Sequence, residues 1–198
     1  KELGLSEFKI SLGHVGFFRA LLAQSGLSPE GQKQAGHAAA RKDLPRLEEL
    51  LTGERIEKAK RRVILEAPEL YGREDVLKRG RALAGRNRSA RIAVDRLEQI
   101  YRLLEAGGLK SHLLLDLGEF RGFDYYDGVV FDVFAAGLGN ELGGGGRYNH
   151  LIGRFGRDLP STGFAFDIDR LFRALEGGTE KGSGAKVDVL VCAAAASG

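Results

Sequence analysis

The 198-residue sequence contains no methionine, and its single cysteine is Cys192. A lone cysteine excludes an internal disulfide framework and any zinc site built from clustered cysteines. No apolar run approaches the ~20 residues of a membrane-spanning helix, and the N-terminus lacks the basic-then-apolar pattern of a secretory leader. From these absences we expect a cytoplasmic protein that does not enter a membrane.

The lack of methionine extends to position 1, although average usage predicts a few methionines in a chain of this length. The sequence opens on "KELGLSEFKISLG", which is typical of a helix end followed by a strand. It closes on "KVDVLVCAAAASG", a strand of the buried type. We therefore interpret the sequence as a fragment of a longer chain, in which 187–198 begins a truncated C-terminal segment.

No strong excess of either charge is present, because 30 basic and 27 acidic residues give a net charge of +3. This balance argues against a nucleic-acid partner, and no aromatic-interleaved RNA platform is found. The basic residues do cluster in "EKAKRRVILE" and "KRGRALAGRNRSAR". Each cluster fits either a solvated helix face or an anion-binding patch.

Between about residues 14 and 110, the sequence has the apolar periodicity and the capping residues of α-helices. Ser28 and Asp43 suit helix N-termini, and Pro29 suits a first helical position. The strongest helix lies in "RSARIAVDRLEQIYRLLEAGGL", with a predicted apolar stripe of Ile92, Leu97, Ile100, Leu103 and Leu104. A first strand within 1–13 precedes this block, which we interpret as an all-helical insertion.

From about residue 111 the pattern changes to strands rich in aromatic and β-branched residues, as in "SHLLLDLGEF" and "GFDYYDGVVFDVFAAG". "STGFAFDIDRLF" is typical of a strand that runs directly into a helix, and 177–186 is typical of a linker. The order of elements predicts an α+β domain. Its antiparallel sheet, with flanking helices, comprises 1–13 and 111–176, and the helical block 14–110 is inserted between them.

Motifs for common active sites are missing. The sequence has no phosphate loop, no dinucleotide fingerprint between a strand and a helix, no H-E-x-x-H and no G-x-S-x-G. The four histidines are scattered along the chain: His14, His37, His112 and His150. We expect structural roles for them and predict no metal site.

Three remaining segments place arginine or tyrosine beside glycine at strand ends: "EFRGFDYYDGVVFDVF", "ELGGGGRYNHLIGRF" and "PSTGFAFDIDRLF". Arg121 and Arg147 can each hold a carboxylate or phosphate in a bidentate manner. Three tyrosines offer ring faces with a hydroxyl group: Tyr125, Tyr126 and Tyr148. Each feature alone fits a surface ion pair or a core tyrosine. Together they favour a site for a small polar aromatic ligand.

The geometry of strands constrains these segments further. Because Arg121 and Tyr126 are an odd number of residues apart, they share one pocket only if Gly122 breaks the strand. The run Gly143–Gly146 is interpreted as a strand whose missing side chains form a pocket floor, with Tyr148 as one wall. On this view, valine at Gly145 or Gly146 blocks the ligand.

Arg170 lies in the first turn of the expected C-terminal helix, where a cation opposes the helix macrodipole. Such a placement needs a partner. The sequence leaves two alternatives open, an acidic ligand or an internal carboxylate such as Asp167.

These segments resemble the catalytic core of class II histidyl-tRNA synthetases over about 113–175. "RGFDYYDGVVFDVF" is similar to the family's Arg-Gly-Leu-Asp-Tyr-Tyr strand, and "GGGGRY" resembles its Gly-Gly-Arg-Tyr segment. "TGFAFDIDRL" resembles class II motif 3, with Gly163, Asp167 and Arg170 at its positions. The resemblance implies that Arg121 meets the carboxylate of histidine. It implies a pocket formed by Tyr125, Tyr126, Gly145, Gly146, Arg147 and Tyr148.

The rest of the chain is more similar to a paralogous family, the regulatory subunits of ATP phosphoribosyltransferase. "ISLGHVGFFRALLAQSGL" resembles their Leu-Gly-His-Val-Gly segment, where synthetases typically have Asn-Ser, and "ARKDLPRLEELL" and "APELYGREDVL" resemble their helical region. Synthetases commonly have glycine at the position of Asp167. A carboxylate there repels a triphosphate and argues against ATP binding and adenylation.

The resemblance therefore implies a non-catalytic regulatory subunit with no catalytic residue and no cofactor. Its regulatory ligand is free histidine, and its partner is the short-form catalytic subunit, which joins ATP to phosphoribosyl pyrophosphate in the first step of histidine biosynthesis. A homodimer within a hetero-oligomer is expected. The alternative is a fragment of an active histidyl-tRNA synthetase that uses ATP and tRNA.

Overall fold

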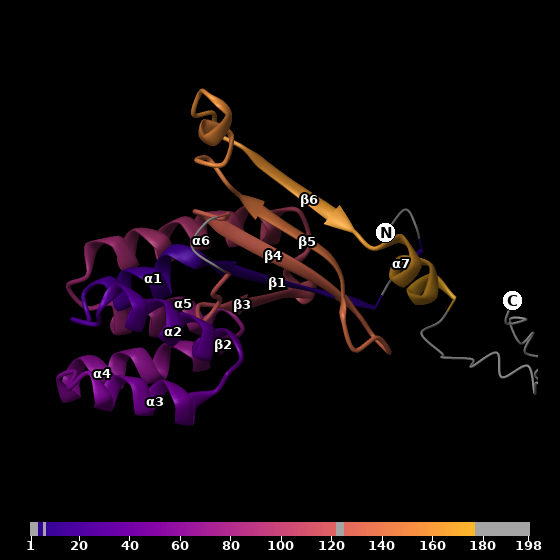
Figure 1. Ribbon diagram of the computed structural model, residues 1–198. Coiled ribbons are helices and arrows are strands. Elements are labelled where there is room, and N and C mark those ends of the chain that lie inside the picture. The colour runs from indigo at the N-terminus through magenta and orange to yellow at the C-terminus, as the bar shows by residue number, and fades with distance from the viewer. Residues whose placement is uncertain (1–3, 6, 122–124, 177–198) are drawn as a thin grey trace, which may run out of the picture.

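The computed structural model describes residues 4–5, 7–121 and 125–176. Figure 1 shows one twisted sheet with a group of helices at one end of it. Six strands form the sheet in the order β2-β3-β1-β4-β5-β6. Their bounds are β1 Phe8–His14, β2 Tyr71–Gly72, β3 Leu113–Asp116, β4 Val129–Ala135, β5 Glu141–Arg147 and β6 Thr162–Phe166.

The α+β class is confirmed, but the sheet is mixed rather than wholly antiparallel. β1 and β3 pair in parallel, and the other four neighbouring pairs are antiparallel. The reason is the long helical block between β1 and β3, since a crossover of this kind returns the chain in its original direction.

Seven α-helices lie within the described residues: α1 Val15–Ala23, α2 Pro29–Ala40, α3 Leu44–Gly53, α4 Lys58–Glu66, α5 Asp75–Ala84, α6 Arg88–Ala106 and α7 Ile168–Leu175. Short 3₁₀ turns span Ala67–Glu69, Lys110–His112 and Ile152–Phe155. The predicted caps are confirmed, because Ser28 accepts a hydrogen bond from the Gly31 N–H and Asp43 from the Arg46 N–H. Each of these bonds satisfies a backbone donor that has no partner within its helix.

Two expectations about the helical block were wrong. The block is not all-helical, because β2 pairs with the outer edge of β3. The stripe predicted on α6 was also wrong in part: Leu97 is buried and Leu104 packs against the core, whereas Ile92 and Leu103 are exposed. The buried face of α6 is Ala90, Ala93, Val94, Leu97 and Tyr101. Small alanines therefore belong to the buried face of α6, where α1 packs against it. The prediction failed because it counted only the large apolar side chains as the buried stripe.

Helices and strands share one hydrophobic core on one side of β1, β3 and β4, which we call the helix face. The strand residues that take part alternate along each strand: Ile10 and Leu12, Leu113 and Leu115, and Val129 and Phe131. They meet fully buried side chains of α1, including Phe17, Phe18 and Leu22. Burying a large apolar side chain contributes about 1.5–3 kcal/mol, so this core dominates the stability of the domain.

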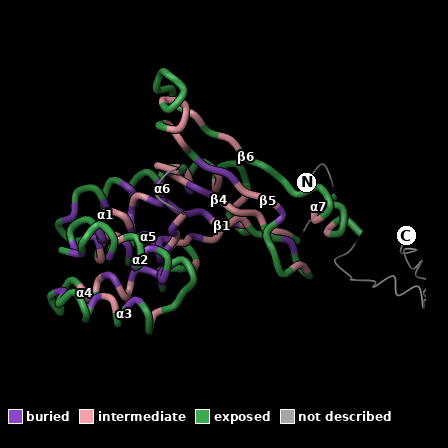
Figure 2. Tube along the Cα trace, in the orientation of Figure 1, coloured by how far each residue is buried: buried purple, intermediate pink, exposed green. Residues whose placement is uncertain are grey.

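The far end of the sheet is much more open. Figure 2 shows exposed residues along most of β6 and α7, whereas buried residues occur in the helical group and in β1, β4 and β5. Helix α7 has no buried residue, and Phe164 on β6 is 70% exposed. In the described part of the chain, no helix is long and apolar enough to cross a membrane. The predicted linker and C-terminal segment, 177–198, lie outside the described residues.

Candidate functional site

A row of small residues crosses the sheet on the side opposite to the helix face. Gly13 on β1 pairs with Val130 on β4, Val130 pairs with Gly146 on β5, and Gly146 pairs with Gly163 on β6. Paired residues in neighbouring strands point to the same side of a sheet. The row of three glycines and one valine therefore lies on one side of the sheet, which we call the site face.

Each glycine of the row lies under a larger side chain. A Cβ atom on Gly13 would lie 2.7 Å from Cβ of Glu119, and one on Gly146 would lie 2.8 Å from Cδ1 of Tyr126. A Cβ atom on Gly163 would lie 2.3 Å from the hydroxyl of Tyr148. Glycine is required here because side chains from three separate segments converge on the row.

Arg121 lies at the centre of this convergence, between two carboxylates. Its Nε donates to Oε1 of Glu119 at 3.0 Å, and a terminal nitrogen donates to Oδ2 of Asp132. The three side chains are between 20% and 24% exposed, so these bonds form in partly dehydrated surroundings. Burial raises the pKa of Glu119, and the charge of Arg121 opposes that rise.

A cluster of tyrosines stands beside the arginine. The ring centroids of Tyr125 and Tyr126 are 4.6 Å apart, and those of Tyr125 and Tyr148 are 5.1 Å apart. The guanidinium carbon of Arg121 lies 5.5 Å from the centroid of the Tyr126 ring, within range of a cation–π interaction. Burial raises the pKa of Tyr126, so its hydroxyl stays protonated at neutral pH.

The predicted strand break between Arg121 and Tyr126 is consistent with the described residues. Neither residue lies in a strand, and β4 begins only at Val129; Gly122 itself lies outside the described residues. Arg19 on α1 donates to the carbonyl of Arg121 and to the carbonyl of Tyr126, both at 2.8 Å. One cation from the helical core thus fixes both flanks of this segment.

The seven predicted histidine contacts divide between the two sides of the sheet. Gly145 pairs with Phe131, a residue of the helix face, so it points away from Gly146 and the tyrosines. A Cβ atom on Gly145 would lie 2.2 Å from the carbonyl oxygen of Gly163. Valine there would disrupt the pairing of β5 with β6 rather than fill a pocket. Arg147, two residues further along β5, points the same way as Gly145.

The motif 3 segment resolves the two alternatives left open for Arg170. The Asp167 carboxylate accepts the Arg170 N–H at 3.1 Å and caps α7. The Arg170 side chain bonds to Oδ2 of Asp167 and Oε1 of Glu141, each at 3.1 Å, and to the Glu141 carbonyl at 2.7 Å. The partner of Arg170 is therefore internal.

His14, where β1 meets α1, has a structural role. Its Nδ1 accepts the Gly16 N–H at 3.1 Å and caps α1. The side chain is buried, and its burial, with the charges of Arg96 and Arg147, lowers the His14 pKa to about 4. Within the described residues, no group of three potential ligands is arranged to hold a metal ion.

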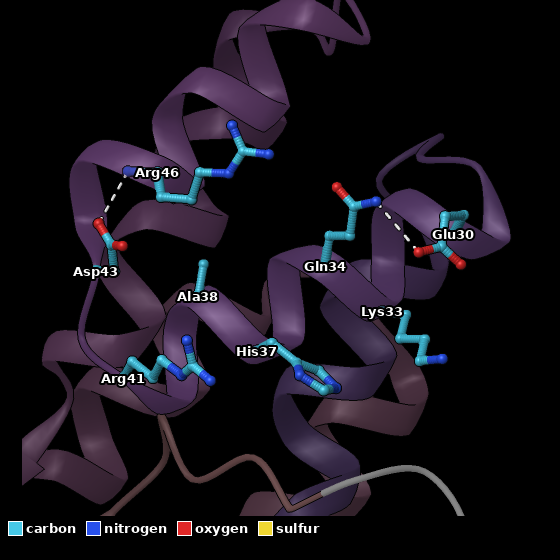
Figure 3. A pocket seen from close by; sticks show the side chains of 8 residues that line it. All are labelled: Glu30, Lys33, Gln34, His37, Ala38, Arg41, Asp43 and Arg46. Carbon is cyan, nitrogen blue, oxygen red and sulfur yellow. Dashed lines mark hydrogen bonds between the residues drawn. The ribbon is translucent and has the colours of Figure 1, made fainter.

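A separate hollow of about 370 Å³ lies between α2 and α3. Figure 3 shows its polar lining, with Lys33, His37 and Arg41 on or next to α2 and Arg46 on α3. Arg46 is already paired with Glu49 at 2.6 Å. The lining includes none of the residues of the site face.

Several residues of the site were missed in the sequence, namely Gly13, Arg19, Glu119, Asp132 and Gly144. Gly144 would place a Cβ atom 2.3 Å from Oδ1 of Asp132, so it leaves room for the carboxylate that holds Arg121. The available signal was the "GEFR" segment, in which Glu119 and Arg121 alternate with the buried Phe120. For Arg19, one cation on an apolar helix, no local signal existed.

Comparison with known proteins places this geometry in context. The model of the family described as Histidyl-tRNA synthetase matches residues 1–171. Over 176 residues, the chain is 39% identical to the ATP phosphoribosyltransferase regulatory subunit of Geobacter metallireducens. That alignment covers 89% of this chain and 40% of the Geobacter protein.

Solved structures agree with the sequence comparison. An ATP phosphoribosyltransferase regulatory subunit/histidyl-tRNA synthetase from Bacillus halodurans superposes with a TM-score of 0.80 at 29% identity, covering 88% of this chain and 46% of that chain. A chain of the ATP phosphoribosyl transferase (HisG:HisZ) complex from Thermotoga maritima gives a TM-score of 0.58 at 16% identity, covering 74% and 51%. That second likeness shows the fold alone. The synthetase-like fold is confirmed, and the chain spans less than half the length of the Geobacter and Bacillus proteins.

Proposed function

Because the chain belongs to the histidyl-tRNA synthetase family, we propose that it is part of a regulatory subunit of ATP phosphoribosyltransferase that binds free histidine. The name of the Geobacter relative supports the regulatory role. The structural observation that supports a regulatory subunit over a synthetase is the pairing of Arg170 with Asp167 and Glu141.

The charge around Arg170 disfavours a nucleotide triphosphate. Two carboxylates lie 3.1 Å from nitrogens of this guanidinium, so one positive charge is surrounded by two negative charges. A triphosphate that approached Arg170 would meet net repulsion and would have to displace both bonds. This arrangement supports ligand binding without adenylation.

The site face offers groups that match the parts of a histidine molecule. Arg121 uses Nε and one terminal nitrogen for protein carboxylates, and we propose that its other terminal nitrogen meets the ligand carboxylate. Unlike a triphosphate, histidine also carries an ammonium group, which offsets the charges of these two protein carboxylates. Glu119 and Asp132 suit the ligand ammonium group, which is a cation. The ring faces of Tyr126 and Tyr148 suit the imidazole, because stacked or edge-to-face aromatic pairs stabilise each other.

The regulatory mechanism follows from linkage between two binding events. If histidine binds the low-activity state of the complex more tightly, it shifts the population toward that state. Histidine then raises the affinity between the two subunits in that state by some factor. By reciprocity, the catalytic subunit in that state raises the affinity for histidine by the same factor. We propose the short-form catalytic subunit as the partner, a homodimer within the hetero-oligomer, a cytoplasmic location and no cofactor.

The second candidate is a histidyl-tRNA synthetase fragment. It is favoured by the family match over residues 1–171 and by the name of the Bacillus protein, which includes both functions. The two candidates differ in chemistry, because only the synthetase forms an adenylate from ATP and histidine.

The deciding experiment uses the full-length protein in two assays. We expect no histidine-dependent exchange between pyrophosphate and ATP. We also expect histidine to inhibit the catalytic subunit only when the full-length protein is added. Robust exchange would show that the protein is a synthetase, and histidine inhibition that is independent of the added protein would remove its regulatory role.

A further inference from the structure

Helices α4 and α5 border a groove that contains none of the residues of the site face. One hollow of about 300 Å³ lies among α1, α4 and the α5–α6 turn, and a second of about 440 Å³ lies between α4 and α5. Ala59, Val63 and Leu83 line both, so the two hollows form one depression, which we call the α4–α5 groove. Figure 1 shows α4 at the edge of the helical group farthest from β6.

The rim of the α4–α5 groove is mainly basic, with Glu66 as the one acidic residue in the two described linings. Lys60 and Arg86 line the first hollow, and Arg62 and Arg79 line the second. In the ranges that the structure describes, Lys60, Arg62 and Arg86 form no ion pair, and Arg79 has only a distant one, at 3.8 Å from Asp75. The four cations come from the two basic clusters of the sequence. The fold thus brings both clusters to one groove.

The floor of the groove is apolar. Leu21, Val63, Ile64 and Leu83 line it together with small alanines, and Gln24, Ser25 and Asn87 add polar groups in the first hollow. No aromatic side chain belongs to either lining. An apolar floor between two basic edges matches a helix that has an apolar face and acidic flanks, since such helices bind in grooves through residues at i, i+3, i+4 and i+7.

We propose that the α4–α5 groove binds an acidic amphipathic helix of the catalytic subunit, an assignment of partner that rests on the proposed function. The floor receives the apolar face of this helix, and the rim cations meet its carboxylates and accelerate association. Single-stranded nucleic acid is a poorer match, because its binding sites stack bases on aromatic side chains, which the described lining lacks.

The test measures association of the full-length protein with the catalytic subunit by surface plasmon resonance. The double variant Lys60→Glu/Arg86→Glu should weaken binding at least about tenfold at low salt, mainly through a slower association rate. The effect should shrink toward 1 M salt, where the Debye length falls to ~3 Å. Both substitutions place an acid near a helix N-terminus, so the fold is not compromised.

A steric variant tests the floor independently of charge. Ala59 is exposed on α4 and lines both hollows, so Ala59→Gln should obstruct the groove and weaken association without changing net charge. The matched controls lie on or next to α2, where Lys33→Glu/Arg41→Glu makes the same change in charge and Ala40→Gln the same change in size. Both controls should bind the catalytic subunit as the wild type does.

Three outcomes contradict the proposal in different ways. If wild-type protein does not associate with the catalytic subunit, the proposed function fails and this partner fails with it. If the wild type associates but the groove variants bind as well as the controls, the groove inference alone is overturned. It is also overturned if the groove variants lose only affinity for a single-stranded RNA probe.

Discussion

The helical end of the molecule and the β6–α7 end are held together by different interactions. At the helical end, Phe17, Phe18, Leu47 and Leu97 are fully buried in one core. At the other end, large apolar side chains are exposed, with Ile168 at 71% and Phe172 at 60%. Helix α7 is positioned instead by polar bonds, namely the Asp167 cap and the Arg170–Glu141 pair.

This difference bears on where the candidate site lies. The row of small residues on the site face runs from Gly13 and Val130, which are buried beside the core, to Gly163, which is only partly buried. The Arg121 cluster is tied to the helical end through Arg19, whereas Tyr148 stands over β6. One wall of the site is therefore anchored to the helical core, and we expect the other to adapt to a ligand.

The largest expected effect compares one substitution at the two ends. Phe18→Ala should lower the free energy of unfolding by about 3–5 kcal/mol, because it removes a fully buried ring from the core. Phe172→Ala on α7 should change it by less than about 0.5 kcal/mol. Urea denaturation measures both. Equal losses would show that α7 is buried as deeply as the helical core and would remove the contrast.

A second prediction uses pH to probe the junction of β1 and α1. The pKa of His14 is about 4 in the folded protein against 6.5 for the free side chain. The contribution of His14 to the free energy of unfolding is fully present above pH 6.5 and is lost as pH falls toward 4. The reason is that the unfolded state binds a proton at His14 more tightly than the folded state does. At pH 5 the loss is about 2 kcal/mol.

His14→Asn keeps a side-chain acceptor for the cap but does not titrate. Its unfolding free energy should therefore fall less than that of the wild type between pH 7 and pH 5. Burial raises the pKa values of Asp116 and Glu119, so these two carboxyl groups increase the free energy of unfolding as pH falls. Their effect is the same in both proteins and does not alter the comparison. Parallel pH profiles of the two proteins would refute the buried neutral state of His14.

The smallest expected effect concerns the polar bonds of α7. Asp167→Ala removes the cap of α7 and one partner of Arg170. The free energy needed to open α7 should therefore fall by about 1 kcal/mol. Since α7 has no buried residue, the change should remain local. Hydrogen exchange of the α7 amides should become faster while global stability is unchanged. Asp169→Ala, in the first turn of the same helix, is the control and should have little effect.

Features set by short-range chemistry were predictable from the sequence. The caps at Ser28 and Asp43 follow from residues close to them in the sequence. The convergence of Arg121, Tyr126 and Tyr148 was also anticipated. It came from the resemblance to a family rather than from spacing.

Features set by register were not predictable. Alternation along β5 separates Gly146 from Gly145 and Arg147, but the pairing with β4 and β6 decides which side carries the tyrosines. The partners of Arg121 also depend on register, because Asp132 reaches it from β4 across the position left open by Gly144. Neither relation can be obtained from one segment alone.

The most direct test of the account is a calorimetric titration of histidine into the full-length protein and two arginine variants. Arg121→Ala should weaken binding by about 1.5–3 kcal/mol, because a charge-assisted bond to the ligand is lost. Arg147→Ala, on the opposite side of β5, should leave the affinity within about a factor of two of the wild type. Unchanged affinity in Arg121→Ala, or a larger loss in Arg147→Ala, would contradict the assignment of the site face as the histidine site.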